Sequence, residues 1–324
     1  MNKIKTDIQT KDILQNKLHS IMNSGLADFI KTTNARRIAV RGSIRFAIVS
    51  VIFIVAISLF LFMAQVDINT LFGKVIVMIA MLWVTVLLIS GRSWFIGSTL
   101  LAREVNMALV PILANTFNRT LLYTYNESAV DSVRDMLNES GLVTDKVTTI
   151  KVKNIYTVFS EVDMRVHEIA FGQNDGQSRP KSTNYTAVFI DVNLSQEAPT
   201  QTAFSTVGSK YGFAHDTFVK YLQTDKHFSP SKNTSEALAV FTADKDSVDA
   251  DVSAELLQSL QEWGSEAKVN IRAMRTGSKL YILVPASKES ITYTSTSTKQ
   301  ESIERYASLV AQPIWHALML TEEV

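Results

Sequence analysis

The feature that most constrains this chain is a pair of long uncharged stretches in its N-terminal third. Residues 46–64 contain no charged side chain, and residues 75–89 are again uncharged after a short polar break that carries Asp67 and Lys74. A helix rises about 1.5 Å per residue, so roughly 20 apolar residues cross the hydrocarbon core of a bilayer. The first stretch meets this length, and the second meets it once its apolar flanks are included. We therefore predict a transmembrane hairpin in residues 46–91, with spans at about 46–64 and 71–90.

A cleaved signal peptide does not explain the first stretch. The 45 residues that precede it are too many for the charged beginning of a signal peptide, and the apolar run itself is too long for the core of one. Gln65, Val66 and Asp67 also make a poor cleavage site, because small residues are required there. We therefore expect the first span to be retained.

Arginines on one side of the first span predict the orientation. The cluster consists of Arg36, Arg37, Arg41 and Arg45. Basic residues beside a span stay on the cytoplasmic side, and the loop between the spans carries only Asp67 and Lys74. Two spans return the chain to its starting side, so we predict a bacterial inner-membrane protein with both termini in the cytoplasm. Trp94 and Phe95, which follow the second span, are predicted to be interfacial anchors.

The cytoplasmic tail, residues 1–45, is expected to contain an amphipathic helix. Its apolar residues recur three and four positions apart, as Leu14, Leu18, Ile21, Met22, Leu26, Phe29 and Ile30. This face can pack on the soluble domain or on a second copy, or it can lie on anionic lipid. We favour packing, because Gly25 interrupts the pattern and the polar face is not rich in basic residues.

The remaining residues predict a helical neck followed by an α+β domain. The neck, residues 92–147, has a helical apolar pattern from about residue 100 to 137, in which Pro111 predicts a kink or a division of the helix and Gly141 a helix end. From residue 148 onward, β-branched and aromatic residues and a stretch of alternation predict strands. The predicted strands cover parts of 148–169, 185–194, 203–207 and 237–242, and a β-hairpin is predicted at 269–284 around Gly277. Helices at about 252–263 and 303–318, the latter bent at Pro313, complete a domain over 148–324 with a mainly antiparallel sheet flanked by helices.

Composition and motifs exclude several kinds of site. The chain has no cysteine, which rules out disulfides, thiolate metal sites and cysteine nucleophiles. A net charge of +1 gives no general attraction to nucleic acid, so no nucleic-acid partner is expected. The densest acidic group is Asp244, Asp246, Asp249 and Asp251, whose spacing fails the calcium-loop pattern and fits a solvated turn before a helix. Zinc, phosphate-loop, dinucleotide and serine-hydrolase motifs are absent, so we predict no catalytic, metal or cofactor-binding residue and no cofactor.

One small polar group remains as a candidate for chemistry. Asp163, Arg165 and His167 alternate with apolar residues, so in a strand they share one face. They are interpreted either as an acid/base group or as the polar face of a half-buried strand, and the second interpretation is the more common one.

Three segments carry a family resemblance: residues 149–172 as paired strands, residues 228–263 as a strand, acidic turn and helix, and residues 271–284 as the following hairpin. With these segments and its overall layout, the chain resembles the bacterial family of two-span membrane proteins called domain of unknown function 3137 (DUF3137). The resemblance implies the same membrane architecture. That family has no agreed activity or catalytic set, so the resemblance implies no site residues.

These observations lead to an expected function and two alternatives. We expect a membrane-anchored protein that acts as a protein-interaction or assembly module at the cytoplasmic face of the inner membrane and not as an enzyme. Its partners would be the bilayer and either another protein or its own copies. The alternatives are a pore or transport component formed by oligomerised hairpins, and a membrane-tethered enzyme that uses Asp163, Arg165 or His167.

Overall fold

The computed structural model divides the chain into two compact units. The first contains Met1–Met22, Leu109–Tyr293 and Glu304–Val324, and the second contains Asn23–Ala108 and Thr294–Ile303. The structure describes residues 10–65, 70–125, 129–143, 147–159, 162–173, 183–206, 215–224, 228–231, 234–243, 254–286 and 300–322.

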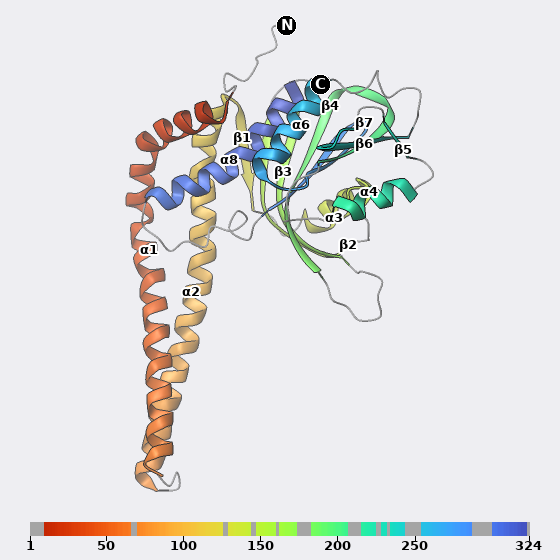
Figure 1. Ribbon diagram of the computed structural model, residues 1–324. Helices are drawn as coiled ribbons and strands as arrows, with labels where there is room; N and C mark the ends of the chain where they lie inside the picture. The colour runs from red at the N-terminus through yellow and green to blue at the C-terminus, as the bar shows by residue number, and fades with distance from the viewer. Residues whose placement is uncertain are drawn as a thin grey trace. The chain divides into compact units, whose positions relative to one another are not determined.

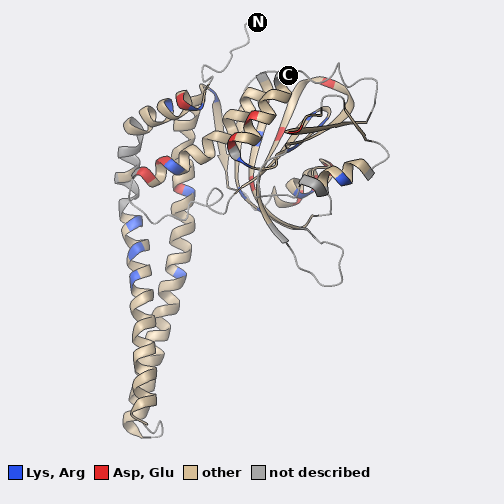
Figure 2. Ribbon diagram, in the orientation of Figure 1, with Lys and Arg blue, Asp and Glu red and all other residues tan. Residues whose placement is uncertain are grey.

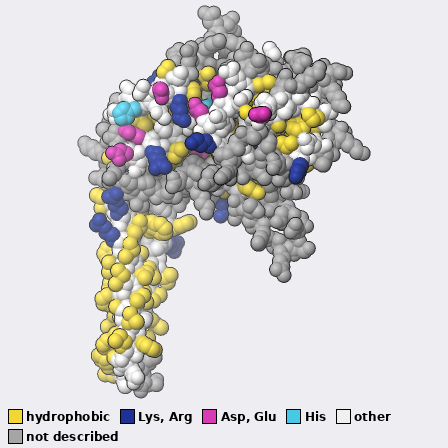
Figure 3. Space-filling view, in the orientation of Figure 1, with side chains coloured by type: hydrophobic (Ala, Val, Ile, Leu, Met, Phe, Trp, Pro, Cys, Tyr) yellow, Lys and Arg dark blue, Asp and Glu magenta, His cyan; other side chains and the backbone are white. Residues whose placement is uncertain are grey.

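Two long apolar helices supply the second unit, and both are candidate membrane spans. They are α1 (Lys11–Met63) and α2 (Leu71–Phe117), and the segments Ala35–Met63 and Leu71–Phe117 reach mean hydropathies of 3.0 and 2.5. Only 6% of each apolar window is buried, whereas a core helix of a soluble protein would be mostly buried. The apolar parts of both helices carry no charged residues and are covered with hydrophobic side chains (Figures 2 and 3). These two helices support a membrane protein.

Within the second unit, the two helices contact each other through small and aromatic side chains. The Phe53 and Trp83 rings lie 4.6 Å apart, and the Ser43 hydroxyl lies 3.3 Å from that of Ser93. A Cβ atom added to Gly97 would lie 2.8 Å from the Val40 side chain, so glycine allows this close approach.

Both helices are longer than the sequence pattern suggested. The expected tail helix and the first span are one continuous helix, α1. The second helix also continues beyond its expected span and through Pro111, which removes one backbone hydrogen bond without ending it.

The first unit is built on one antiparallel sheet (Figure 1), which has seven strands in the described part of the chain. The strands are β1 (Thr120–Thr124), β2 (Val147–Phe159), β3 (Met164–Gln173), β4 (Thr183–Thr206), β5 (Ser229–Pro230), β6 (Leu238–Thr242) and β7 (Arg272–Pro285). Their order is β1-β2-β3-β4-β6-β5, and β7 also pairs with β4. The α+β class with an antiparallel sheet is therefore confirmed.

Helices cover both faces of this sheet. On one face, α3 (Val130–Glu139) and α4 (His215–Thr224) contribute to a core that includes Phe189 and Leu283. On the other face lie α6 (Ala254–Ala267) and α8 (Gln300–Glu322), which share a pocket with sheet residues such as Val188. Strands in the middle of the sheet are consequently buried on both sides.

The predicted helical neck needs a correction. After α2 ends at Phe117, residues 120–124 form the edge strand β1, which pairs with β2, and α3 packs into the core through Val133 and Leu137. A strand of five residues is too short to be recognised by periodicity in a predominantly helical pattern.

The predicted β-hairpin at 269–284 is also wrong, because residues 272–284 lie within the single strand β7. Gly277 has a φ of +56° and lies opposite Ala198, where the register between β7 and β4 shifts. The glycine therefore marks an irregularity within a strand, where a positive φ is needed as it would be in a turn. At the same place β4 continues through Glu197 and Pro199, beyond residue 194, where the predicted strand ends.

Two local predictions are confirmed. Gly141 follows the last helical residues of α3 with a φ of +68°, the left-handed conformation typical of a helix end. The terminal helix is present as α8, with Pro313 inside it.

The apolar face of the N-terminal helix packs against protein within the first unit. Leu14, Leu18 and Met22 are buried, and the first two line a small hollow together with residues of α8. Two ion-pair contacts accompany this packing: Lys11 Nζ lies 3.6 Å from a Glu266 carboxylate oxygen, and His19 Nδ1 lies 3.6 Å from Glu304. The side chains at positions 26 and 29 lie outside the described residues.

Candidate functional site

The polar group predicted on β3 is only partly brought together. His167 Nε2 lies 2.7 Å from Asp191 Oδ1, and Arg165 Nε lies 3.2 Å from Asp191 Oδ2. Asp191 comes from the neighbouring strand β4, where its backbone is opposite Arg165. Asp163 lies before β3 with an exposed side chain, and its backbone carbonyl accepts a hydrogen bond from the Asn193 N–H at 3.1 Å. The carboxylate partner of His167 is therefore Asp191 and not Asp163.

His167 lies in the core instead of on a half-exposed face. Its side chain is 2% exposed, and its ring lies 5.8 Å from the ring of Phe189. Nδ1 has no hydrogen-bond partner in the described part of the chain. A general acid or base must reach a proton on its substrate, which burial on the α3 and α4 side of the sheet prevents. The arrangement is consequently one of a packed histidine–carboxylate pair.

A different side chain on β3 has the properties of a functional group. Glu168 follows His167, so it points to the opposite face of the sheet, toward α6 and α8, and it is only 4% exposed. Burial raises the pKa of its carboxyl group to about 8, while a hydrogen bond from Asn154 and the charge of Lys153 act in the opposite direction. At neutral pH the carboxyl group is therefore mostly protonated.

Side chains from neighbouring strands hold this carboxyl group. The Asn154 side-chain amide donates a hydrogen bond to Glu168 Oε2, and the Tyr123 hydroxyl donates to Asn154 Oδ1 at 2.8 Å. Tyr156 lies beside them, with its ring 5.3 Å from that of Tyr123. Burial, followed by the proximity of Tyr306 on α8, raises the pKa of Tyr156 well above its ordinary value, so its hydroxyl stays neutral.

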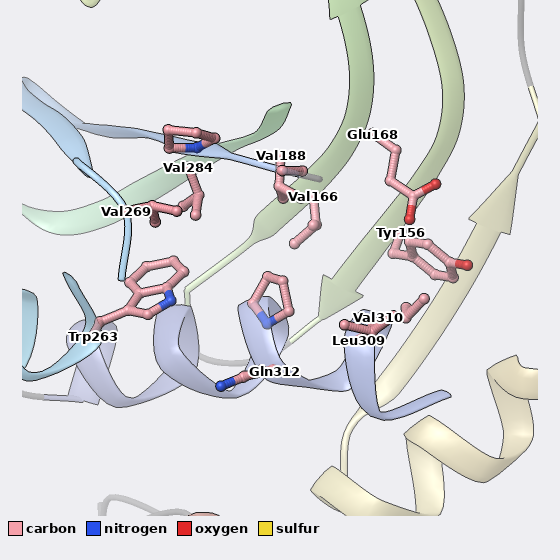
Figure 4. A pocket seen from close by; sticks show the side chains of 13 residues that line it. Tyr156, Val166, Glu168, Val188, Trp263, Val269, Val284, Leu309, Val310 and Gln312 are labelled. Atoms are coloured by element: carbon pink, nitrogen blue, oxygen red, sulfur yellow. The ribbon is translucent and has the colours of Figure 1, made fainter. Parts of the chain in front are cut away.

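Glu168 lines a pocket of about 230 Å³ between the sheet and α8. Figure 4 shows Glu168 and Tyr156 at one end of this pocket and Trp263 toward the other, with Leu309 and Val310 on the helix side. Most of the other lining side chains are aliphatic. A largely apolar pocket lined by a few polar side chains, one of them a carboxyl group with a perturbed pKa, is the usual form of a small-molecule site.

Sequence reasoning missed Glu168 although a signal was present. Met164 and Val166 alternate as a buried strand face, so the next position on that face, residue 168, should also be buried. A glutamate at such a position departs from the apolar pattern. Asn154 and Asp191 carried no comparable signal, because their roles depend on pairing between strands that are distant in sequence.

Another histidine lies where α1, α6 and α8 meet. His316 stacks on Trp263 with ring centroids 4.7 Å apart, and its Nε2 lies 3.6 Å from a Glu266 carboxylate oxygen. Burial, and then the charge of Lys11, lowers the pKa of His316 to about 3. The contact with Glu266 is too long for a hydrogen bond, so burial dominates and the imidazole is neutral at pH 7.

The residues predicted to orient the chain lie in the second unit. Arg36 forms an ion pair with Glu104, Arg37 is buried, and Trp94 and Phe95 are exposed. The other two arginines of the cluster, Arg41 and Arg45, are partly or fully exposed on α1. The exposure of the two aromatic residues fits an interfacial position, but the orientation of the chain stays a prediction.

The acidic group of Asp244, Asp246, Asp249 and Asp251 lies outside the described residues. Among the residues that are described, no group of three or more histidine, aspartate or glutamate side chains could hold a metal ion.

Searches for similar proteins found no match: no family model fits the chain, and neither a curated protein nor a solved structure resembles it significantly. The resemblance to the DUF3137 family therefore stays a prediction.

Proposed function

We propose that the protein is a membrane-anchored module of the bacterial inner membrane whose cytoplasmic α+β domain binds a protein partner. The anchor is supported by α1 and α2, whose apolar windows are almost entirely exposed. The arginine cluster before the first span supports cytoplasmic termini.

The observation that carries the proposal is an exposed apolar patch at the edge of the sheet, formed by Leu122 and Phe159, which we call the β1 corner. Leu122 is 55% exposed on the edge strand β1, and Phe159 is 40% exposed at the end of β2. The register pairs Leu122 with Thr157 and Thr120 with Phe159, so Leu122 and Phe159 share one face.

An extended segment of a partner protein fits this corner. One side of β1 is paired with β2, and in the described part of the chain no strand pairs with its other side. An edge strand can accept a further strand through its backbone groups, and exposed apolar side chains beside it add contact area and specificity.

Site-specific crosslinking in native membranes tests this proposal. A photoreactive benzoylphenylalanine at position 122 should give a discrete crosslinked species, because the β1 corner would be covered by the partner. The same residue at position 258, which is exposed on α6, is the matched control and should not give that species. Identical products at both positions, or none from position 122, would contradict the proposal.

The orientation is tested separately with topology reporters. A reporter inserted between residues 65 and 70 should be periplasmic, and one fused after Val324 should be cytoplasmic. A periplasmic C-terminal reporter would disprove the proposed location of the domain.

The structure does not favour an enzyme that uses Asp163, Arg165 or His167. His167 is enclosed in the core, and Asp163 is not its partner. A pore formed by the spans gains no specific support either, since residues 46–64 and 75–89 contain no ionisable side chain. Ion flux through liposomes that contain the purified protein would favour the pore over the anchor.

A further inference from the structure

We propose that the pocket between the sheet and α8 binds a small, mostly apolar molecule that carries one hydrogen-bond acceptor, and that Glu168 donates the hydrogen bond. This site is separate from the β1 corner and does not depend on a protein partner.

The geometry places the carboxyl group of Glu168 in the pocket as a hydrogen-bond donor. Asn154 occupies Oε2 of Glu168, and the described residues place no donor on Oε1, so the carboxyl proton can reside there. Tyr123 holds the Asn154 amide through its Oδ1 atom, which directs the amide N–H groups toward Glu168. The carboxyl group is therefore oriented before a ligand arrives.

The surroundings favour a neutral acceptor over a charged ligand. The pocket lining contains no lysine, arginine or histidine that could neutralise an anion. A cationic ligand would need Glu168 to be ionised, but burial keeps this carboxyl group protonated. The positive charge of nearby Lys153 would also repel a cation. A carbonyl or ether oxygen accepts the proton of Glu168 without a new charge.

The size and lining of the pocket limit the ligand further. The volume is about 230 Å³, whereas an apolar cavity of roughly 150 Å³ holds benzene, so a ligand has on the order of ten non-hydrogen atoms. Val166, Val188 and Val310 offer aliphatic contacts, and Trp263 offers an aromatic face toward the end away from Glu168. A small aromatic or short-chain ketone matches both requirements.

Binding of acetophenone and of ethylbenzene to the full-length protein in lipid nanodiscs tests the proposal. The two molecules have similar shapes, but only acetophenone has an acceptor. Calorimetry, corrected with empty nanodiscs, should show one acetophenone per chain with about tenfold tighter binding than ethylbenzene, the difference expected for one buried neutral hydrogen bond.

Variants identify the site. Glu168→Leu should remove the preference for acetophenone, whereas Glu168→Gln, whose amide is still a donor, should retain most of it. Val310→Trp should abolish binding of both molecules by filling the pocket. Glu301→Leu changes an exposed glutamate at the start of α8 and should change nothing.

Three results would overturn the proposal: no acetophenone binding to the wild type, equal binding of the two molecules, or unchanged binding in Val310→Trp. If the Glu168→Leu variant does not fold, the Glu168→Gln and Val310→Trp variants still test the proposal. Crosslinking at position 122 does not depend on this pocket, so each proposal can fail alone.

Discussion

The imidazole of His167 and the carboxylate of Asp191 lie 2.7 Å apart on adjacent strands, with both side chains almost completely buried. Their backbones are offset by two positions in the register, since Asp191 is opposite Arg165 and His167 is opposite Phe189. A polar group removed from water loses its hydration, so each member of the pair depends on the other for its hydrogen bond.

Replacing Asp191 with asparagine should therefore destabilise the protein. The amide has no charge to attract Arg165 and replaces one carboxylate acceptor with a donor, so we expect a loss of about 1–3 kcal/mol in the free energy of unfolding. Thermal unfolding of the full-length protein in detergent measures the loss. Asp163→Asn is the matched control, because Asp163 is exposed just before β3, the strand that carries His167. Equal effects of the two substitutions would show that the buried pair contributes nothing specific.

Glu168→Gln should change how stability depends on pH. The pKa of the Glu168 carboxyl group is about 8 in the folded protein, whereas its ordinary value, which applies to the unfolded chain, is 4.5. Between pH 4.5 and pH 8 the unfolded chain therefore loses a proton that the folded protein keeps. The wild type should therefore lose stability as the pH rises from about 4.5 to 8. At about 1.4 kcal/mol per pH unit, the upper limit of this loss is roughly 5 kcal/mol.

The glutamine variant should show a flatter profile and be more stable than the wild type at pH 8–9. The melting temperature, measured from pH 5 to pH 9, reports the difference. The other titratable groups around Glu168 and Tyr156 are Lys153, Tyr123 and Tyr306, which are unchanged in the variant, as is Tyr156 itself. Parallel profiles for the two proteins would mean that Glu168 does not titrate in this range.

Gly264→Ala should destabilise the domain although alanine favours helices. A Cβ atom at this position would lie 2.6 Å from Thr206 Oγ1. That hydroxyl accepts a hydrogen bond from the Ile271 N–H at 2.8 Å, so the clash disturbs the connection between β4 and the start of β7. We expect a net loss of about 1–3 kcal/mol, larger than the roughly 1 kcal/mol gained in helix propensity. Ser265→Ala, at the exposed neighbouring position, should be close to neutral in the same melting experiment.

Leu18→Ala should show that the N-terminal helix is part of the folded domain. Leu18 is 2% exposed and shares a hollow with residues of α8, so truncation should cost about 2 kcal/mol or more. Ile13, on the same helix, is 43% exposed, and Ile13→Ala should cost less than about 0.5 kcal/mol. Urea unfolding of both variants separates the two cases. A neutral effect of Leu18→Ala would instead favour a helix that lies on lipid.

Features that depend on neighbouring residues could be predicted from the sequence. The two candidate spans follow from uncharged length alone, and the paired strands β2 and β3 follow from alternation and β-branched residues. The end of α3 at Gly141 and the terminal helix α8 follow in the same way from glycine placement and helical spacing. The α+β class was predictable because each of these signals lies within a single segment.

Local sequence patterns were therefore enough to predict the apolar helices, most of the strands and the class of the domain. Three features became visible only in the folded chain: Gly277 interrupts a strand instead of making a turn, His167 contacts Asp191, and Glu168 lines a pocket beneath α8. Each of these depends on the register between strands, or on which sheet face a distant helix covers. The register and the covered face are set by packing between segments that are far apart in the sequence. Glu168 and Gln312, for example, line the same pocket although about 145 residues separate them. A local sequence pattern carries no information about such contacts.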